Sequence, residues 1–227
     1  MLASEIVSRA QTVLNDANGA RWPEAELLKW ISDGQRVIVL VRPDSYSINE
    51  SLTLVAGTKQ TLPSGGLRLL DVIRNLKSNG DPDRSVRMVD RETLDAQDYN
   101  WHVTASTGKV MNFVYDNRDP IHFYVYPQAT AGMKLEILYS KSPVEITTAA
   151  TALVLADVYV EPLFNYVLFR AYSKDAEYAA NAALAQGYMQ VFMSLLGLKT
   201  SKDFAFSPET NKIGATPNLL AARAGGV

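Results

Sequence analysis

A change of hydrophobic period along the chain constrains its fold more than any other feature. Between residues 46 and 140, apolar and polar residues tend to alternate and turn residues are frequent, whereas the flanking segments repeat their apolar residues every three to four positions. The first pattern is typical of half-buried strands and the second of amphipathic helices. We therefore expect an α+β protein, in which an antiparallel β module is inserted between helical segments.

Two helices are predicted before the β module. The first covers residues 2–16, and Gly19 can take the left-handed conformation that often follows a helix. The second covers residues 23–41. It begins with Pro23, whose missing N–H would have no helical partner at that position, and Pro43 prevents its continuation. Helices joined by so short a connection are expected to be antiparallel neighbours.

Short polar turns divide the β module into strands. A loop is expected at residues 78–84 and one helical turn at residues 90–95. Such spacing favours an antiparallel sheet or sandwich. The predicted strands are residues 47–55, 59–62, 67–76, 86–89, 110–115, 121–126 and 134–139.

Helical periodicity returns at residues 156–173 and 175–196. The second of these helices carries a stripe of small residues, namely Ala176, Ala179, Ala180, Ala183, Gly187 and Val191. Small side chains let helix axes approach closely. The stripe therefore predicts packing either within a tight bundle or between identical subunits.

The C-terminal residues 198–227 show no hydrophobic period, and such a segment does not bury enough surface to order itself. We expect a flexible arm that orders on a partner through scattered apolar anchors, namely Leu198, Phe204, Phe206, Ile213, Leu219 and Leu220. The expected organisation is a discontinuous helical bundle of residues 1–45 and 150–197, a β insertion of residues 46–141 and this arm.

Composition excludes several classes of function. The chain has no cysteine, so it has no disulfide, thiolate metal site or cysteine nucleophile. Its formal net charge of −2 argues against a basic face that holds DNA. The first residues lack the pattern of a signal peptide, and no apolar run reaches the ~18 residues of a membrane span. We therefore expect synthesis in the cytoplasm.

Few residues suggest chemistry. Residues 79–83 crowd two carboxylates but lack the spacing of a calcium loop. Residues 62–67 are glycine-rich but lack the lysine and the spacing of a phosphate-binding loop. Neither His102 nor His122 has an evident nucleophile or orienting partner. No enzyme activity, cofactor or metal is therefore expected.

Two groups of side chains could bind nucleic acid. The aromatic residues of the strands could stack on bases, but cross-strand packing is the simpler interpretation because few lysines and arginines lie among them; they are Tyr115, Phe123, Tyr124, Tyr126 and Tyr139. A group of arginines is interleaved with acidic residues, which indicates a mixed solvated or inter-subunit face; it comprises Arg68, Arg74, Arg84, Arg87 and Arg91.

The segment Trp22–Arg36, which follows a short helix ending in Asn15-Asp16, resembles the opening of adaptor proteins of tailed bacterial viruses. The resemblance to these head–tail connectors, those of short-tailed viruses in particular, rests on the order and spacing of motifs over residues 1–196. It continues through Val41–Asp44, Leu54–Pro63, Leu69–Asn75, Pro127-Gln128, the strand ending at Tyr139, the helix of residues 157–173 and the alanine-rich last helix.

The resemblance implies a structural virion protein without enzyme activity. Identical subunits, commonly twelve, would form a ring between the portal and the tail or nozzle protein. DNA would pass through the ring without sequence-specific binding, and the arm would insert along the portal. The protein would be located at the neck of the virion, without membrane contact, after assembly in the host cytoplasm.

Two other classes of function remain open. One is a tail-associated module that binds a receptor or carbohydrate through aromatic residues of the sheet. The other is a small hydrolase, which would lose its activity when His102 or Asp83 is changed.

Overall fold

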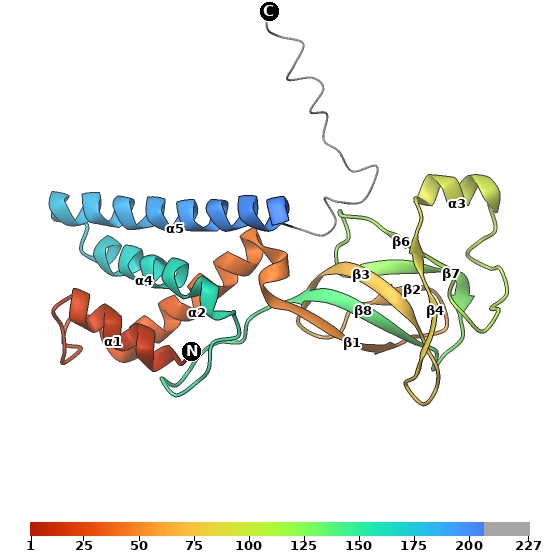
Figure 1. The fold of residues 1–227 in the computed structure, drawn as a ribbon, viewed down its shortest axis with the longest axis horizontal. Helices are drawn as coiled ribbons and strands as arrows, with labels where there is room; N and C mark the ends of the chain where they lie inside the picture. The colour runs from red at the N-terminus through yellow and green to blue at the C-terminus, as the bar shows by residue number, and fades with distance from the viewer. Residues whose placement is uncertain (207–227) are drawn as a thin grey trace, which may run out of the picture. The chain divides into compact units, whose positions relative to one another are not determined.

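The computed structural model describes residues 1–206 and consists of helices and two β-sheets (Figure 1). The prediction of an α+β protein is therefore confirmed. The chain divides into two compact units, each made of separate segments. Of the described residues, one unit contains 1–31, 148–151 and 157–206, and the other contains 32–147 and 152–156.

The first unit is helical. Its elements are α1 (Ala3–Val13), the first part of α2 (Glu24–Val41), the 3-10 turn η2 (Asp157–Tyr159), α4 (Val160–Lys174) and α5 (Ala179–Phe206). The apolar stripe of α1 is buried at Ile6, Val7 and Ala10, and that of α2 at Leu27 and Ile31. Periodic apolar residues therefore provide the buried faces of these helices, as their spacing predicts.

One acidic side chain organises the connection between α1 and α2. After α1 both Asn15 and Gly19 adopt positive φ angles, of 52° and 62°. The Asp16 carboxylate then accepts hydrogen bonds from the backbone N–H groups of Ala20, Arg21 and Trp22 at 2.8–2.9 Å. These bonds, the one from Trp22 foremost, lower the pKa of Asp16. The connection is thus held by the charged form of Asp16.

The polar segment at residues 147–151, which precedes the helices of the C-terminal half, has a structural role. The N–H groups of Ala3 and Ser4, which have no partner inside α1, donate to the carbonyls of Thr151 and Ala149 at 3.0 and 2.8 Å. Unsatisfied N–H groups at a helix start need such partners. The segment therefore fixes the N-terminus of α1.

The second unit contains the two sheets. One has the strand order β1-β8-β3-β4, and the other β2-β7-β6-β5. All neighbours are antiparallel except β5 and β6. The elements are η1 (Pro43–Tyr46), β1 (Ser47–Thr53), β2 (Gly57–Thr61), β3 (Gly66–Leu76), β4 (Pro82–Ser85), β5 (Arg87–Met88), α3 (Arg91–Gln97), β6 (Asn112–Tyr115), β7 (His122–Ala129) and β8 (Lys134–Lys141).

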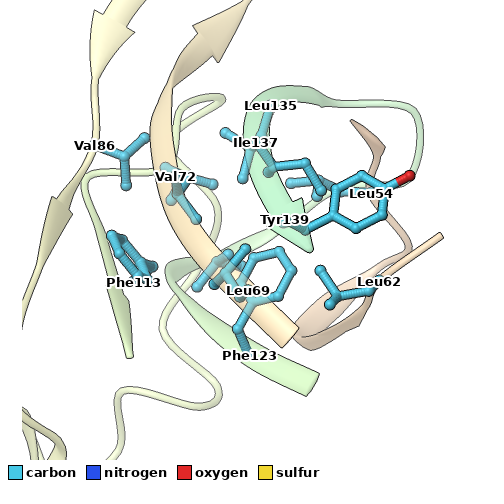
Figure 2. Packing of buried hydrophobic residues seen from close by; sticks show 13 residues of the cluster. Leu54, Leu62, Leu69, Val72, Val86, Phe113, Phe123, Leu135, Ile137 and Tyr139 are labelled. Carbon is cyan, nitrogen blue, oxygen red and sulfur yellow. The ribbon is translucent and has the colours of Figure 1, made fainter. Parts of the chain in front are cut away.

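Both sheets contribute to one hydrophobic core. Figure 2 shows Leu69 and Val72 of β3 and Ile137 of β8 packed with Phe113 of β6 and Phe123 of β7. Along β7 every second residue is buried, as expected for a strand with one face on a core. The two sheets therefore form a sandwich of the kind that short strands and polar turns predict.

Strand β3 departs from simple alternation. Its buried residues Leu69, Val72 and Asn75 are three apart, because its register with β8 shifts at several points. Each shift moves the following side chain to the other face. The predicted loop at residues 78–84 is wrong at its end, since β4 begins at Pro82 and pairs with β3. Proline is compatible with this edge position.

Helix α5 is longer than predicted. The expected arm begins at residue 198, but α5 continues to Phe206, so Leu198, Phe204 and Phe206 belong to a helix. An ion pair of 2.8 Å between Lys199 and Asp203, one turn apart, accompanies this extension. The remaining anchors of the predicted arm lie outside the described residues; they are Ile213, Leu219 and Leu220.

Candidate interaction surface on helix α5

Helix α5 packs on α4 through one face only (Figure 1). Its buried residues are Ala185, Phe192 and Leu196. The ring of Phe192 lies 5.4 Å from that of Tyr166 on α4, and Tyr188 stacks on Tyr172 at 5.6 Å. These contacts define the inner face of α5, and the opposite side of the helix is its outer face.

The predicted stripe lies on the exposed side of the chain. All six of its residues are exposed, namely Ala176, Ala179, Ala180, Ala183, Gly187 and Val191. The predicted helix start at residue 175 is wrong, since α5 begins at Ala179 and Ala176 lies in the turn before it. The contact with α4 is made by other side chains, so the small residues do not serve that contact. The sequence predicts that the stripe packs either within a tight bundle or between identical subunits. This placement argues against packing within the subunit.

A shallow apolar groove runs along this outer face. It is lined by Ala180, Ala183, Leu184, Gly187 and Val191, and by Tyr188, which lies at the border with the inner face because it also stacks on Tyr172. Leu184 and Val191 are 46% and 45% exposed, although aliphatic side chains of this size are usually buried. A side chain on Gly187 would meet nothing within 4 Å. The described residues would therefore leave room for a side chain at residue 187, so no contact among them explains the glycine.

The outer face of α5 carries almost no charge. Residues 179–198 include no Asp, Glu, Lys or Arg. Among the helices of residues 1–206, none is long and apolar enough to cross a membrane. An uncharged, exposed apolar helix face is a surface of the kind that marks contact sites.

The histidines are not arranged for catalysis. His102 Nδ1 lies 3.0 Å from Thr58 Oγ1, and its ring stacks on Trp101. His122 Nδ1 lies 2.7 Å from Asp119 Oδ1. Thr58 and His102 form a hydroxyl–imidazole pair, but no carboxylate hydrogen-bonds to His102 among the described residues, and His122 has an acid without a hydroxyl. Neither histidine therefore belongs to a complete set of nucleophile, base and orienting group.

Asp83, the other residue that the hydrolase hypothesis singles out, is engaged by a lysine. Lys109 Nζ donates to its carboxylate at 2.9 Å. This bond and the backbone N–H of Arg84 lower the pKa of Asp83. A carboxylate with a lowered pKa is a poorer base than an ordinary one. The geometry thus gives no support to a hydrolase.

The aromatic residues of the strands are occupied by packing. Phe123 and Tyr139 belong to the sandwich core. Tyr124 and Tyr126 pack on a second cluster, formed by Leu94, Trp101 and Val114. Tyr115 donates from its hydroxyl to the Pro120 carbonyl at 3.2 Å. These rings do not form a free stacking surface, which argues against both base stacking and a carbohydrate site built on them.

The two candidate ligand loops are turns. Asn79 donates to Asp81 at 2.7 Å, and residues 1–206 include no group of three or more side chains arranged to hold a metal ion. Gly65 has a φ of 81°, and a side chain on Gly66 would lie 2.9 Å from Leu62 and from the Pro63 carbonyl. Turn geometry therefore explains the glycines of residues 62–67.

The arginine group is a mixed face, as its sequence indicates. Arg74 pairs with Glu136 and lowers the pKa of that carboxyl group, and Arg91 pairs with Asp95. Arg68 donates to Asn117 at 2.8 Å. Arg84 and Arg87 line a small hollow on the second unit. Such a distribution lacks the continuous cationic track that DNA binding needs.

Two groove residues were missed by sequence reasoning. Leu184 and Tyr188 form part of its lining, whereas the sequence stripe includes only the small residues and Val191. The available signal was the spacing of Leu184, Val191 and Leu198, which are seven residues apart along one helix. A seven-residue repeat marks a helix face that meets another helix.

Comparison with known proteins gives one family. The model of the family described as SU10 adaptor protein matches residues 1–211. A search of the curated proteins found no match.

Proposed function

Because the chain belongs to the SU10 adaptor protein family, a family of phage head–tail adaptors, we propose that it forms a ring that joins the portal to the tail. The family membership confirms the resemblance read from the sequence, and it supports a structural role rather than catalysis. The observation that supports ring formation is that the apolar outer face of α5 is exposed in the single subunit.

The outer face of α5 has the repeat of a helix-packing seam. Its apolar positions are Leu184, Val191 and Leu198, and its small positions are Ala180, Gly187, Ser194 and Ser201. All these side chains are exposed. Each set repeats every seven residues, which keeps both sets on one side of a helix. We propose that this seam receives a helix of the neighbouring subunit.

Gly187 supports a contact of this kind. A glycine inside a helix costs about 1 kcal/mol relative to alanine, and no neighbour in the described chain requires it. A second helix lying over residue 187 would explain it, since helix axes approach to about 8 Å where the facing side chains are small. The small residues predicted for subunit packing would then line the closest part of the interface.

The portal and tail contacts are assigned to other parts of the chain. We propose that the last part of α5, which begins at Leu198 where the apolar positions of the seam end, and residues 207–227 bind the portal through the apolar anchors named above. The discontinuous helical region of residues 1–45 and 150–197 would build the ring, and the β module of residues 46–141 would meet the tail or nozzle protein.

The proposed ring, of about twelve subunits if it follows the usual symmetry of such connectors, would surround the DNA path. Binding of DNA phosphates needs clustered lysines and arginines. The net charge of −2 and the pairing of arginines with acidic residues on the described chain are compatible with DNA passing through without being held. The protein would then be found at the virion neck, after assembly in the host cytoplasm.

The proposal is tested by the mass of the full-length protein, measured by native mass spectrometry, alone and with the portal of the same virus. We expect a closed ring in the presence of the portal. Gly187→Leu should prevent the ring by filling the seam, while Gln186→Leu, an exposed neighbour outside the seam, should leave it intact. A Gly187→Leu protein that assembles like the wild type would remove α5 as the subunit contact.

The portal contact has a separate test. Deletion of residues 207–227 should weaken binding to the portal in a pull-down assay without changing the melting temperature, because the helices and strands described above all lie within residues 1–206. Unchanged portal binding by the shortened chain would show that the contact is made elsewhere.

A further inference from the structure

The four edge strands of the sandwich differ in how they are protected. Edge strands expose backbone N–H and C=O groups, and proteins usually shield them by shortness, proline, charge or irregular register. Three edges follow this rule. Strand β5 has only two residues, β4 begins with Pro82 and pairs irregularly with β3, and β2 has a register shift between Gly57 and Lys59.

Strand β1 is neither short nor irregular in register, and it has no proline. Its seven residues, Ser47–Thr53, pair with β8 without a register shift, and they include no proline, lysine or arginine. Its one charged residue is Glu50, whose carboxylate accepts a hydrogen bond from the Tyr139 hydroxyl at 2.7 Å. Among residues 1–206, no strand pairs with the other side of β1.

The direction of the free backbone groups follows from the next residue along the chain. The Leu54 N–H donates to the Met133 carbonyl at 2.7 Å, so Leu54 directs its backbone groups toward the β8 side. Backbone groups alternate in direction along a strand. Asn49, Ser51 and Thr53 therefore present their N–H and C=O groups at the open edge.

The side chains along β1 indicate what would pair there. Ile48 and Leu52 are partly buried against the sandwich core, and Glu50 lies between them on the same face. An added strand would cover the exposed parts of both apolar side chains with its own apolar residues. A cationic residue between these would lie opposite Glu50, whereas a second β1 would place glutamate against glutamate, which is unfavourable.

We propose that β1 is a docking edge for an extended segment of a different protein, which adds to the sheet as a fifth, antiparallel strand. The segment carries two apolar residues, four positions apart, with a lysine or arginine midway between them. Its backbone bonds to Asn49, Ser51 and Thr53 supply affinity, and its side chains opposite Ile48, Glu50 and Leu52 supply specificity. This site is independent of the proposed ring and is present in a single subunit.

The test uses the full-length protein and the peptide Thr-Val-Thr-Lys-Thr-Val-Thr with blocked ends, followed by hydrogen exchange of individual amides by NMR. Bound peptide should slow exchange of the Asn49, Ser51 and Thr53 amides by about tenfold or more. A peptide with glutamate in place of lysine should bind at least about tenfold more weakly, because it faces Glu50.

Two variants separate the backbone contact from the side chain. Ser51→Pro removes an outward N–H that no strand of the sheet uses, and should abolish the protection, while Ser51→Ala keeps the N–H and should retain it. Circular dichroism checks that both variants fold. If Ser51→Pro does not fold, the comparison of the lysine and glutamate peptides on the wild-type protein tests the proposal. Equal effects of both peptides, or no protection at millimolar peptide, would overturn the proposal. If sedimentation shows dimers that form through β1, the partner is a second copy of this chain, and the proposal of a different protein is wrong.

Discussion

Helices α4 and α5 lie side by side in the same unit, yet their surroundings differ. In α4 every residue from Pro162 to Leu168 is buried, which covers all sides of nearly two helical turns. In α5, a helix of 28 residues, burial is confined to Ala185, Phe192 and Leu196 among the side chains that the structure describes. Both helices are rich in apolar residues, but only α4 has its apolar surface covered by its own chain.

The difference separates two reasons for an apolar helix. A helix that is apolar on all sides is normally enclosed, and α4 satisfies this rule within one subunit. Helix α5 is also rich in apolar residues, but many of them lie on a surface that meets water, where apolar side chains gain nothing for the stability of the subunit. The outer face of α5 is therefore best explained by contacts outside the subunit, and its inner face by folding.

The largest expected effect is on the inner face of α5. Phe192 is fully buried against Tyr166, so Phe192→Ala should lower the free energy of unfolding by about 3–5 kcal/mol. Val191→Ala, at the adjacent exposed position, should change it by no more than about 0.5 kcal/mol. Urea unfolding of the isolated subunit, followed by circular dichroism, measures both, and similar losses would show that the two faces are not distinct.

A smaller effect of opposite sign is expected on the outer face. Gly187→Ala should raise the free energy of unfolding of the isolated subunit by about 0.5–1 kcal/mol, because alanine is the better helix former and has open space there. The same change should weaken ring formation. Gly197→Ala, also in open space, provides a control for helix propensity. Loss of subunit stability in Gly187→Ala would show that the glycine serves the fold of the subunit.

The sequence predicts helices and strands well where the hydrophobic period is regular. The period of 3.6 in α2 and the period of two in β7 follow directly from buried faces. Prediction from the sequence fails where strand register or local ion pairs determine the structure. The irregular register of β3 hides its strand period, and Gly197 and nearby polar residues suggest a helix end, although local pairs such as Lys199–Asp203 accompany the continuation of α5.

The candidate surface could be predicted only in part. Residue size and spacing identify the small-residue stripe, because both are visible in one chain. Whether the stripe faces α4 or solvent depends on which side of α5 carries Phe192 and Leu196, and that choice is made by packing with Tyr166 and its neighbours. Spacing alone does not rank two apolar faces of one helix.

A pH effect is expected at the inner face. Tyr172 stacks on Tyr188 between α4 and α5, and burial first, then the neighbouring Tyr188, raises the pKa of Tyr172. The folded state therefore keeps the proton of Tyr172 at a pH at which the unfolded state has lost it. Stability from this residue is fully present below the ordinary pKa near 10.0 and is lost as the pH rises through the raised value.

This pH effect can be isolated by one substitution. Tyr172→Phe should reduce the alkaline loss of stability, measured by urea unfolding at several pH values, and should remove one step from the tyrosinate absorbance above the ordinary pKa of tyrosine. The step of Tyr139, whose pKa burial and Glu50 raise to about 12, should remain. Tyr178→Phe is the control, since Tyr178 is 66% exposed. An unchanged alkaline profile in Tyr172→Phe would assign the effect to another group.

The smallest expected effect concerns the end of α4. Lys174 Nζ donates to the Glu26 carboxylate of α2 at 2.6 Å and to the Arg21 carbonyl at 3.1 Å. The two charged side chains are 40% and 32% exposed, so solvent screens their attraction. Lys174→Met, which keeps most of the aliphatic chain, should lower the free energy of unfolding by about 0.2–1 kcal/mol, and less at high salt. A loss as large as that of Phe192→Ala would mean that α4 is held by charge rather than by its covered apolar surface, and the comparison with α5 would then lose its basis.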